Sequence, residues 1–456
     1  MNDLNMAAAV AGQIEAGPSL IDRITNISDF IWGGTWDGAE VLPFPPMVII
    51  LLGVGLYMMI GLRFYPLRQL GSAFAGLFTG RNGSGSGEIS PFAALSTALS
   101  GQVGTGNMAG VATALALGGP GAIFWMWVTA LIGMALAFAE GSLAIRFREK
   151  GPEGHWRGGP MTYIVKGLGP KWTWLAILFC IGTLCSTIIT GNVIQANAVA
   201  DSMNELFGIQ EWLGGVIAAV AVFIVIIGGI KSIGAVAEKV VPLMAAAYIA
   251  MALLAILLDI RDIPETFGRI FGGAFSAQSA AGGFVGAGIM LALRAGVARG
   301  LFSNEAGQGT TPMAHAVAQT DDPRVQGRMA MLGTFIDTVV ICTMTALVIL
   351  TVEGDFVGNG QAVKHAWQSD LTGFAMTSGA FAAAFPTQIG GVAIGSVVAS
   401  IALILFVFST LLTFSYYGER AITFLYDRVP GANARGEKIL HMAWRVIWCF
   451  GVVIGA

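Results

Sequence analysis

Charged side chains are scarce in this sequence, at 11 % of its residues, and their scarcity indicates which solvent the chain occupies. A soluble domain carries about 25 % charged residues, so this chain has too few to cover a water-facing surface. Apolar residues make up 55 %, and the mean hydropathy is +0.73. The 63 glycines suit membrane helices that pack closely or unwind locally. The composition therefore predicts a membrane protein.

Patterns typical of metal sites, disulfides and catalysis are also missing. The four cysteines, Cys180, Cys185, Cys342 and Cys449, lie in apolar runs, so we expect buried thiols and no disulfides. The four histidines have no metal-ligand spacing, and no nucleophile–base pair or nucleic-acid signature is visible. These absences argue against an enzyme. The first 16 residues lack the basic region of a signal peptide, so the first membrane anchor is expected to be internal.

Long apolar runs are what the sequence has instead, and a membrane helix needs about 20 such residues. Ten candidate spans follow: 43–62, 92–117, 120–145, 173–200, 212–230, 236–258, 282–317, 329–351, 391–417 and 440–456. The run 282–317 is too long for one straight crossing. The last run stops at Ala456 without a polar cap, so we expect one further helix to be missing. Segment 361–385 is too polar to span and is predicted to be an external loop with short interfacial helices, either a lid or a passive connector.

The distribution of basic residues predicts the orientation, because Lys and Arg concentrate in cytoplasmic loops. With the N-terminus outside, most basic residues flanking the spans fall on the inner side, and the outer segments keep only Arg23, Arg261, Arg269 and Lys364. We therefore expect an external N-terminal segment (1–40) and a transmembrane domain (41–456) in the cell (inner) membrane.

Two glycine-rich interruptions stand inside predicted spans, at Ser96–Asn107 and at Gly300–Gly309. Interrupted helices leave backbone groups unpaired, which membranes tolerate only where the backbone lines a cavity. The first interruption opens a five-helix set (about 91–259), and the second opens the next set (about 281–456). Because five is odd, the second set is inverted. The sequence thus predicts an all-α polytopic protein with a five-plus-five inverted repeat, an extra N-terminal helix, and a binding site where the breaks meet.

Polar residues near the breaks allow two interpretations each. Half-helix N-termini can bind a carboxylate, and freed carbonyls with hydroxyls suit a dehydrated sodium ion. Ser409 and Thr410 could supply such hydroxyls or bond back to the preceding turn. Asn107 and Gln195 could bind a ligand or join helices.

The intramembrane acids need partners. We expect Glu140 to form a structural pair with Arg146. Glu305 and Arg299 flank the second break, and we expect a gating or structural ion pair there rather than direct contact with a ligand. Asp337 is either a buried acceptor or a proton site.

At these motifs the sequence resembles the alanine or glycine:cation symporter family. The resemblance is carried by Ser96–Ala112, Leu301–Gly309 and Ser415–Arg420, and it extends from about Pro43 to Ala456. It implies a leucine-transporter-type architecture and uptake of alanine or glycine by alternating access, with sodium as the coupling ion and no other cofactor.

The resemblance also implies roles for individual residues. The substrate site would consist of Gly104, Thr105, Gly106 and Asn107 in the first break, Gln195 in the fourth span, and Phe302, Ser303 and Asn304 in the second break. Phe414 stands where the family often has tryptophan, which would change the size of the pocket. The sodium site would consist of the carbonyls of Ser100, Val103 and Phe406 with the hydroxyls of Ser409 and Thr410.

A proton-coupled carrier on the same fold is the alternative, and it would need a titrating acid such as Asp337. A channel would need a filter repeat, and nothing here resembles one. We expect the chain to function as a monomer in the bilayer.

Overall fold

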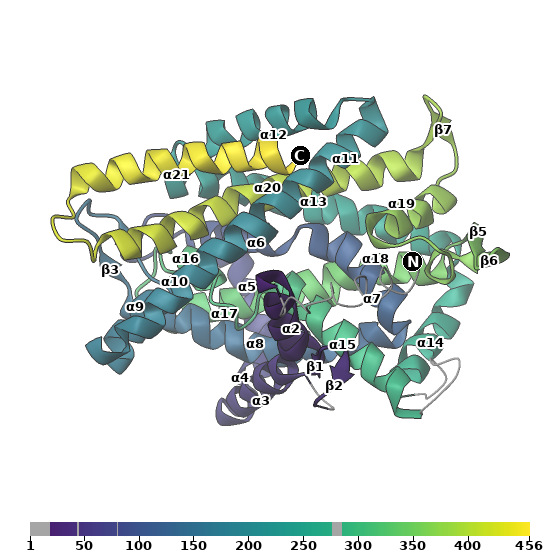
Figure 1. Cartoon of the computed structure of the whole chain (residues 1–456), viewed down its shortest axis with the longest axis horizontal. Coiled ribbons are helices and arrows are strands. Elements are labelled where there is room, and N and C mark those ends of the chain that lie inside the picture. Colours follow the sequence, from purple (N-terminus) through teal and green to yellow (C-terminus); the bar gives the residue numbers. More distant parts are fainter. Residues whose placement is uncertain (1–18, 43–44, 80, 276–284) are drawn as a thin grey trace, which may run out of the picture. The chain divides into compact units, whose positions relative to one another are not determined.

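The computed structural model describes residues 19–42, 45–79, 81–275 and 285–456, and most of them are helical (Figure 1). The chain divides into two units, Met1–Gly53 and Val54–Ala456. The first contains α2 (Leu20–Gly33) and the short hairpin β1–β2 (Thr35–Trp36, Ala39–Glu40). Ser19 starts α2 with a capping box, in which Asp22 N–H donates to Ser19 Oγ at 3.1 Å.

All ten predicted spans contain helix, although residues 43–44 and 282–284 lie outside the described residues. The unbroken spans are α3 (Pro46–Gly61), α8 (Gly121–Phe147), α12 (Glu211–Ile226), α13 (Gly229–Leu258), α20 (Ile394–Tyr426) and α21 (Ala434–Gly455). Within the described residues six helices are long and apolar enough to cross a membrane. The prediction of a polytopic helical membrane protein is confirmed.

Both predicted interruptions are real breaks. The second span runs as α6 (Pro91–Gln102), an irregular turn, the π-helical turn η1 (Gly106–Gly110) and α7 (Val111–Gly118). The seventh runs as α15 (Val285–Asn304), a non-helical stretch, and α16 (Thr311–His315). In that stretch Glu305 has φ +53° and is followed by Gly307 and Gly309, also at positive φ. Such angles stop a right-handed helix.

Two other spans contain π-helical turns, which often mark functional sites. The fourth consists of α10 (Thr173–Ile188), η3 (Ile189–Val193) and α11 (Ile194–Phe207). The eighth consists of α17 (Pro323–Thr334), η6 (Phe335–Cys342) and α18 (Thr343–Thr351). Gln195 follows the first of these turns, and Asp337 lies in the second.

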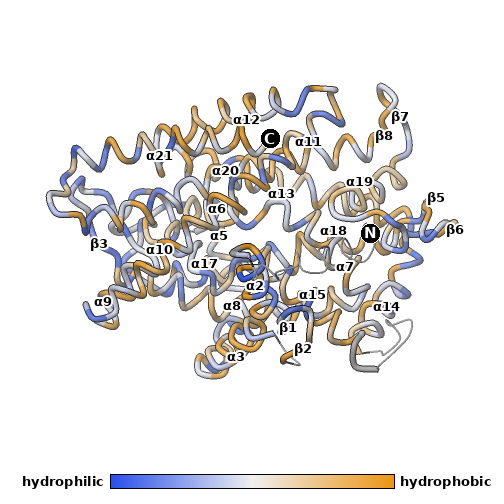
Figure 2. The backbone as a smooth tube through the Cα atoms, viewed as in Figure 1, coloured by the Kyte–Doolittle hydropathy of each residue, from blue (hydrophilic) through white to orange (hydrophobic). Residues whose placement is uncertain are grey.

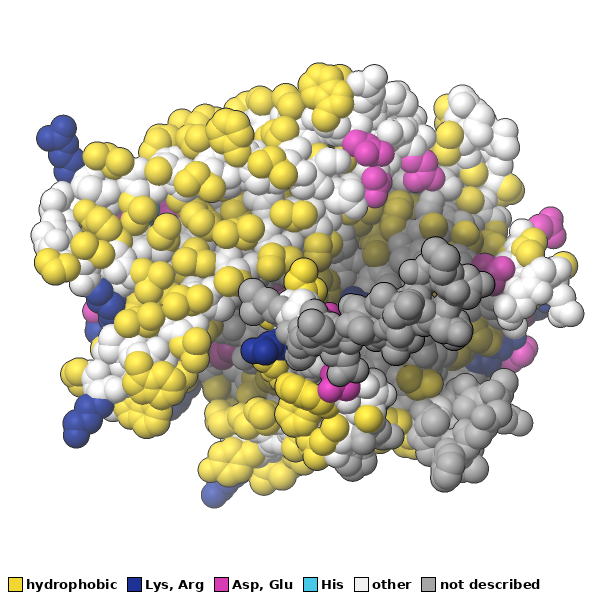
Figure 3. All heavy atoms as spheres, in the orientation of Figure 1, with side chains coloured by type: hydrophobic (Ala, Val, Ile, Leu, Met, Phe, Trp, Pro, Cys, Tyr) yellow, Lys and Arg dark blue, Asp and Glu magenta, His cyan; other side chains and the backbone are white. Residues whose placement is uncertain are grey.

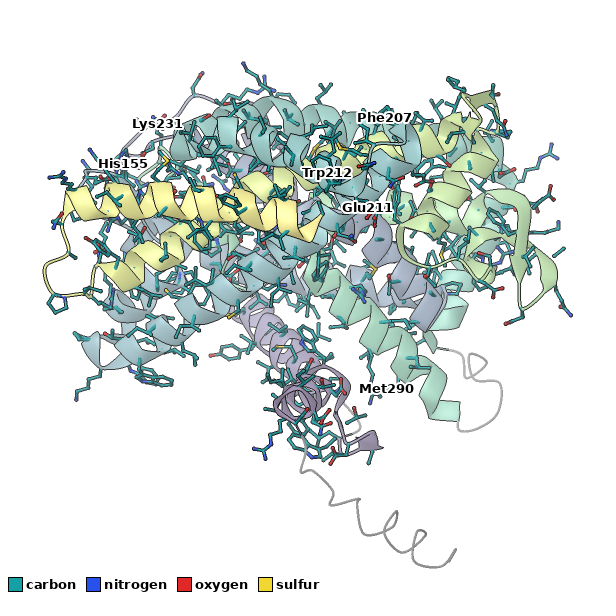
Figure 4. The ribbon with its side chains drawn as sticks, turned by 45° about the horizontal axis from the view of Figure 1, so that its top comes forward. His155, Phe207, Glu211, Trp212, Lys231 and Met290 are labelled. Carbon is teal, nitrogen blue, oxygen red and sulfur yellow. The ribbon has the colours of Figure 1, made fainter. Side chains whose placement is uncertain are left out.

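The loops of the second unit gather at two opposite ends (Figures 1 and 2). One end holds β3–β4 (Glu149–Lys150, Trp156–Arg157), α9 (Pro160–Leu168), η2 (Pro170–Trp172) and the turn from α20 to α21. The other holds η4 (Ile260–Asp262), α14 (Ile263–Phe275), and the elements between α18 and α20. Figure 4 shows His155 and Lys231 near the start of α21, whereas Glu211 and Trp212 lie near its end. The predicted inner and outer loops thus fall on different ends.

The predicted external segment 361–385 differs from expectation, because it holds a β-strand as well as helices. β5 (Glu353–Gly358) and β6 (Gln361–His365) form a hairpin, followed by η7 (Ala366–Gln368), α19 (Gly373–Ala384) and the hairpin β7–β8 (Gln388–Ile389, Val392–Ala393). Asn359 and Gly360 at the tip have φ +51° and +73°. Asn-Gly is the preferred pair for such a two-residue turn and therefore predicts a hairpin. The hairpin was missed because the segment that follows was interpreted as amphipathic helix.

Small residues bring the helices of the second unit close together. A Cβ at Gly141 of α8 would lie 2.7 Å from Ala330 Cβ of α17, and one at Gly296 of α15 would lie 2.3 Å from the Ala122 oxygen. Large apolar side chains such as Ile224 and Phe450 are exposed instead. Hydrophobic side chains cover much of the upper and left parts of the face in Figure 3. This pattern is typical of helices packed in lipid. Two shorter helices, α4 (Tyr65–Arg68) and α5 (Leu70–Thr79), lead from α3 to α6.

Candidate binding site between the two broken helices

Backbone oxygens at the end of α6 meet two hydroxyls of α20. Ser409 Oγ donates to the Ser100 oxygen at 3.3 Å, and Thr410 Oγ1 donates to the Val103 oxygen at 3.2 Å. Both hydroxyls also lie within 3.0 Å of the Phe406 oxygen, one turn earlier on α20. The hydroxyls therefore bond back to their own helix, as one interpretation predicted, and they also reach the first break. All five residues of the predicted sodium site come together.

Gly104 lies between this oxygen cluster and the fourth span. A Cβ at Gly104 would be 2.7 Å from Thr410 Oγ1 and 3.3 Å from Gln195 Oε1. Only a residue without a side chain lets the break approach both groups. Its N–H donates to Asn107 Oδ1 at 2.9 Å, so the amide of Asn107 caps the break.

Gln195 reaches the break from the fourth span. Its Nε2 donates to Thr105 Oγ1 at 3.0 Å, and its Oε1 lies 3.4 Å from the Thr105 nitrogen. The second break faces the same place, because a Cβ at Gly106 would lie 3.3 Å from both Phe302 Cδ1 and Ser303 Cα. Gly104, Thr105, Gly106, Asn107, Gln195, Phe302 and Ser303 thus surround one region.

Asp337 joins the two breaks, although sequence reasoning did not include it in the site. Asn107 Nδ2 donates to Asp337 Oδ1 at 2.6 Å, and Ser303 Oγ donates to Oδ2 at 2.7 Å. Thr338 Oγ1 donates to the same Oδ2 at 2.8 Å. Cys342 Sγ is 3.4 Å from Asn107 Nδ2 and 3.3 Å from Ser303 Oγ. The only sequence signal for this arrangement was an acid within an apolar span.

Two of the predicted substrate residues have their contacts elsewhere. Asn304 Nδ2 donates to Thr338 Oγ1 at 3.1 Å, and Asn304 Oδ1 accepts the Ala306 N–H at 3.0 Å. This amide therefore connects the backbone of the second break to η6. The Phe414 ring packs on Gly191, where a Cβ would be 2.1 Å from Phe414 Cδ1. Phe414 thus borders η3, a few residues before Gln195.

The expected ion pairs of the buried acids were wrong. Glu140 accepts the Gly307 N–H at 3.2 Å rather than pairing with Arg146. Glu305 accepts from Thr310 Oγ1 at 2.6 Å, and no ion pair joins it to Arg299 in the described part of the chain. Both carboxylates instead bond to the non-helical stretch after α15, where free N–H and hydroxyl groups are closer than any guanidinium.

The site is closed to solvent. Asn107 and Asp337 are 0 % exposed, and Ser303, Gln195 and Thr410 are also buried. On the side of the predicted lid, Thr377 Oγ1 of α19 donates to the Met108 oxygen at 3.0 Å. A ligand can therefore reach the site only after helices move.

A polytopic helical protein whose two broken helices meet at a buried polar site has the architecture of a secondary transporter. The sequence model of the Sodium:alanine symporter family matches residues 34–456, and this chain belongs to that family. It is a transporter, and its class of activity is cation-coupled amino-acid symport.

Individual relatives agree with this assignment. The sodium/alanine symporter AgcS of Methanococcus maripaludis is 40 % identical over 94 % of this chain and 88 % of the relative. A putative sodium/proton-dependent alanine carrier protein of Bacillus subtilis is 40 % identical over 84 % and 77 %. The solved outward-open structure of a Na+-coupled sialic acid symporter covers 90 % of this chain and 80 % of that one, with a TM-score of 0.52 and 11 % identity. The last shows the fold alone.

Proposed function

We propose that this protein takes up alanine or glycine together with sodium by alternating access. In this proposal it lies in the cell (inner) membrane with its N-terminus outside and works as a monomer. The observation that carries the proposal is the oxygen cluster of α6 and α20. The Ser100 and Val103 carbonyls lie 3.3 and 3.2 Å from two hydroxyls. Carbonyl and hydroxyl oxygens are the ligands that unwound membrane helices offer to sodium.

The charge balance of the site supports a zwitterion bound with a cation. No lysine or arginine hydrogen-bonds to the described residues of the site, so nothing fixed there neutralises a substrate carboxylate. The N–H groups of Gly104 and Thr105 at the first break now bond to neutral amides. A carboxylate would take over these N–H groups, and the sodium ion beside them would balance its charge.

The close contact between the breaks supports a small substrate. Gly106 packs against Phe302 and Ser303 so tightly that even a Cβ would be 3.3 Å from both residues. A larger amino-acid side chain would have to push Phe302 aside, and overpacking of that kind costs about 1–3 kcal/mol. Alanine and glycine should therefore compete with labelled alanine, and leucine should compete poorly.

Proton coupling is the second candidate, favoured by one observation. Asp337 is fully buried and bonds to both breaks through Asn107 and Ser303. A carboxylate in that position is a candidate carrier of a proton, since intramembrane acids commonly serve as proton relays.

The test is uptake of radiolabelled alanine into proteoliposomes that contain the full chain. One arm has an inward sodium gradient, the second replaces sodium with potassium, and the third adds an inward proton gradient without sodium. Accumulation in the first arm alone supports sodium coupling. Accumulation that follows the proton gradient in the third arm would transfer the proposal to Asp337, and no uptake in any arm would refute alanine as the substrate.

A matched pair of variants locates the site. Asn107→Ala should reduce uptake at least about tenfold, because hydrogen bonds to charged groups contribute about 1.5–3 kcal/mol. Asn192→Ala removes an amide from the same membrane interior, but Asn192 donates to the Trp448 oxygen at 2.8 Å, away from the breaks. Uptake by the Asn192→Ala variant should therefore keep its dependence on sodium. Equal losses in both variants would contradict the proposed position of the site.

A further inference from the structure

Two segments at one end of the second unit run side by side as an unusual pair. Residues 83–89 precede α6, and residues 316–321 follow α16. Ser84 N–H donates to the Gln319 oxygen at 3.1 Å, Glu88 N–H to the Val317 oxygen at 2.8 Å, and Gln319 N–H to the Ile89 oxygen at 2.8 Å. We call this pair of segments the seam. It joins the two half-helices that lie on the same side of the breaks.

Alternating glycines make the seam close. In Gly83-Ser84-Gly85-Ser86-Gly87, each glycine faces the other segment. A Cβ would be 2.3 Å from Gln319 Oε1 at Gly83, 2.8 Å from Asp321 Oδ2 at Gly85, and 2.4 Å from the Ala318 carbonyl at Gly87. Side chains at these positions would force the segments apart. Gly85 and Gly87 also have φ of +134° and +154°, angles that residues with a side chain rarely adopt.

Arg148, directly after α8, holds both sides of the seam. Its Nη2 donates to the Ser86 and Thr320 oxygens, both at 2.7 Å. Its Nη1 donates to the Ala316 and Ala318 oxygens at 3.0 and 2.7 Å. The side chain is 4 % exposed. A single planar guanidinium thus binds four backbone carbonyls from two segments far apart in sequence, a geometry that a lysine cannot reproduce.

Further contacts fix the guanidinium in place. Arg148 lies 4.4 Å from the centre of the Trp156 ring and 3.4 Å from Asp321 Oδ1. Hydrogen bonds from the Ser86 hydroxyl and N–H hold the pKa of Asp321 below its usual value, so this acid stays ionised beside Arg148. The arginine is therefore held from α8, from β4, and from both segments of the seam.

We propose that Arg148 is a positioning residue for transport, which latches the half-helices α6 and α16 together and keeps their end of the pathway closed. This inference rests on the proposed alternating access. The predicted topology makes this end cytoplasmic. Release of sodium and substrate inward then requires α6 to separate from α16, and the seam with its arginine must open first. Loss of the latch shifts the population toward the state open at this end.

The measurement is alkylation of Cys342, which lies beside Asn107 and Ser303, by a membrane-impermeant maleimide. The background carries C180A, C185A and C449A, and vesicles are prepared right-side-out and inside-out, without sodium. Because labelling needs no transport, the result is independent of which substrate or ion is carried. Arg148→Gln removes the guanidinium, and Gly87→Ala separates the segments without changing charge. Arg146→Gln is the matched control, because Arg146 lies in the last turn of α8, just before Arg148, and is exposed. Gly71→Ala is the second control, because its new Cβ would meet no atom of another segment within 4 Å.

Both test variants should label Cys342 about tenfold faster than the parent from the face that carries Arg148, and more slowly from the opposite face. Arg148→Lys should recover only part of the difference. Unchanged labelling in folded Arg148→Gln and Gly87→Ala, or equal acceleration in the controls, would overturn the latch. If Arg148→Gln does not fold, as judged by gel filtration, Gly87→Ala decides the question. Failure of alanine uptake in the parent would refute the proposed function without affecting this readout.

Discussion

The oxygen cluster makes a sharp prediction for Gly104→Ala. The new Cβ would lie 2.7 Å from Thr410 Oγ1, which is closer than such atoms normally approach. Gly104 does not adopt a positive φ, so alanine fits its backbone and the strain falls on the neighbour. Thr410 can relieve it only by turning its hydroxyl away from the Val103 oxygen, now 3.2 Å distant. The substitution therefore acts on the proposed sodium ligand without removing it.

The magnitude follows from the overlap. Inserting a methyl group into a packed interior costs about 1–3 kcal/mol. Since each ~1.4 kcal/mol is a tenfold change in an equilibrium constant, half-saturating sodium should rise about 5- to 150-fold. Maximal uptake at saturating sodium should change much less, because Thr410 can still coordinate once the ion compensates the strain. A shift in sodium affinity, rather than a loss of folding, is the expected signature.

The assay is alanine uptake into proteoliposomes across a sodium series at constant ionic strength. Gly110→Ala is the matched control, because Gly110 lies in the same broken span, at the end of η1, and its new Cβ would meet only the Thr105 oxygen, at 3.9 Å. That variant should keep the sodium affinity of the parent. Equal half-saturating sodium in Gly104→Ala and the parent would refute the assignment of Thr410, as would an equal shift in Gly110→Ala.

Three further predictions follow from other contacts. Thr377→Val removes the hydrogen bond from Thr377 Oγ1 to the Met108 oxygen, which is 3.0 Å long. It should raise the KM for alanine about 2- to 10-fold without changing the affinity for sodium. An unchanged KM would exclude α19 as a lid. Glu419→Gln leaves two guanidiniums, both bonded at 2.8 Å, without their carboxylate, and should destabilise the folded state by about 3–5 kcal/mol, measured by thermal unfolding in detergent. Asp337→Asn should abolish uptake, measured with each of the two gradients; retained sodium-driven uptake would exclude an essential carboxylate.

Much of the fold follows from the sequence, because a lipid bilayer permits few backbone structures within its apolar interior. Apolar runs of sufficient length must be helices, and the predicted spans agree with the observed helices to within a few residues at most ends, as for 120–145 and α8 (Gly121–Phe147). The two breaks were also predictable, since glycine and amide residues interrupt apolar runs there. The hairpin at Asn359-Gly360 was missed, because polarity was given more weight than the turn pair. The proposed repeat boundaries stay a prediction.

The site was only partly predictable, for a physical reason. Residues on one broken segment, such as Gly104 and Asn107, are identified by the break itself. Partners from other helices are brought in by packing, which no local pattern records. Asp337 reaches both breaks from η6, and Glu140 finds the Gly307 N–H rather than the arginine nearest in sequence. Side-chain donors on the broken segments, together with backbone N–H groups freed by the breaks, thus decide which acids bind there.

The bonds at Asp337 bear on the choice between the two proposed coupling ions, sodium and the proton. Oδ1 accepts from the Asn107 amide, and Oδ2 accepts from the Ser303 and Thr338 hydroxyls. A proton on this carboxyl group would need an acceptor, so one hydroxyl would have to turn and give up its present bond. Binding of sodium by the oxygen cluster of α6 and α20 requires no such rearrangement, because all three donors to Asp337 can stay in place. These bonds therefore support the proposed sodium coupling, and proton-driven uptake that survives in Ser303→Ala but not in Asp337→Asn would reverse that argument.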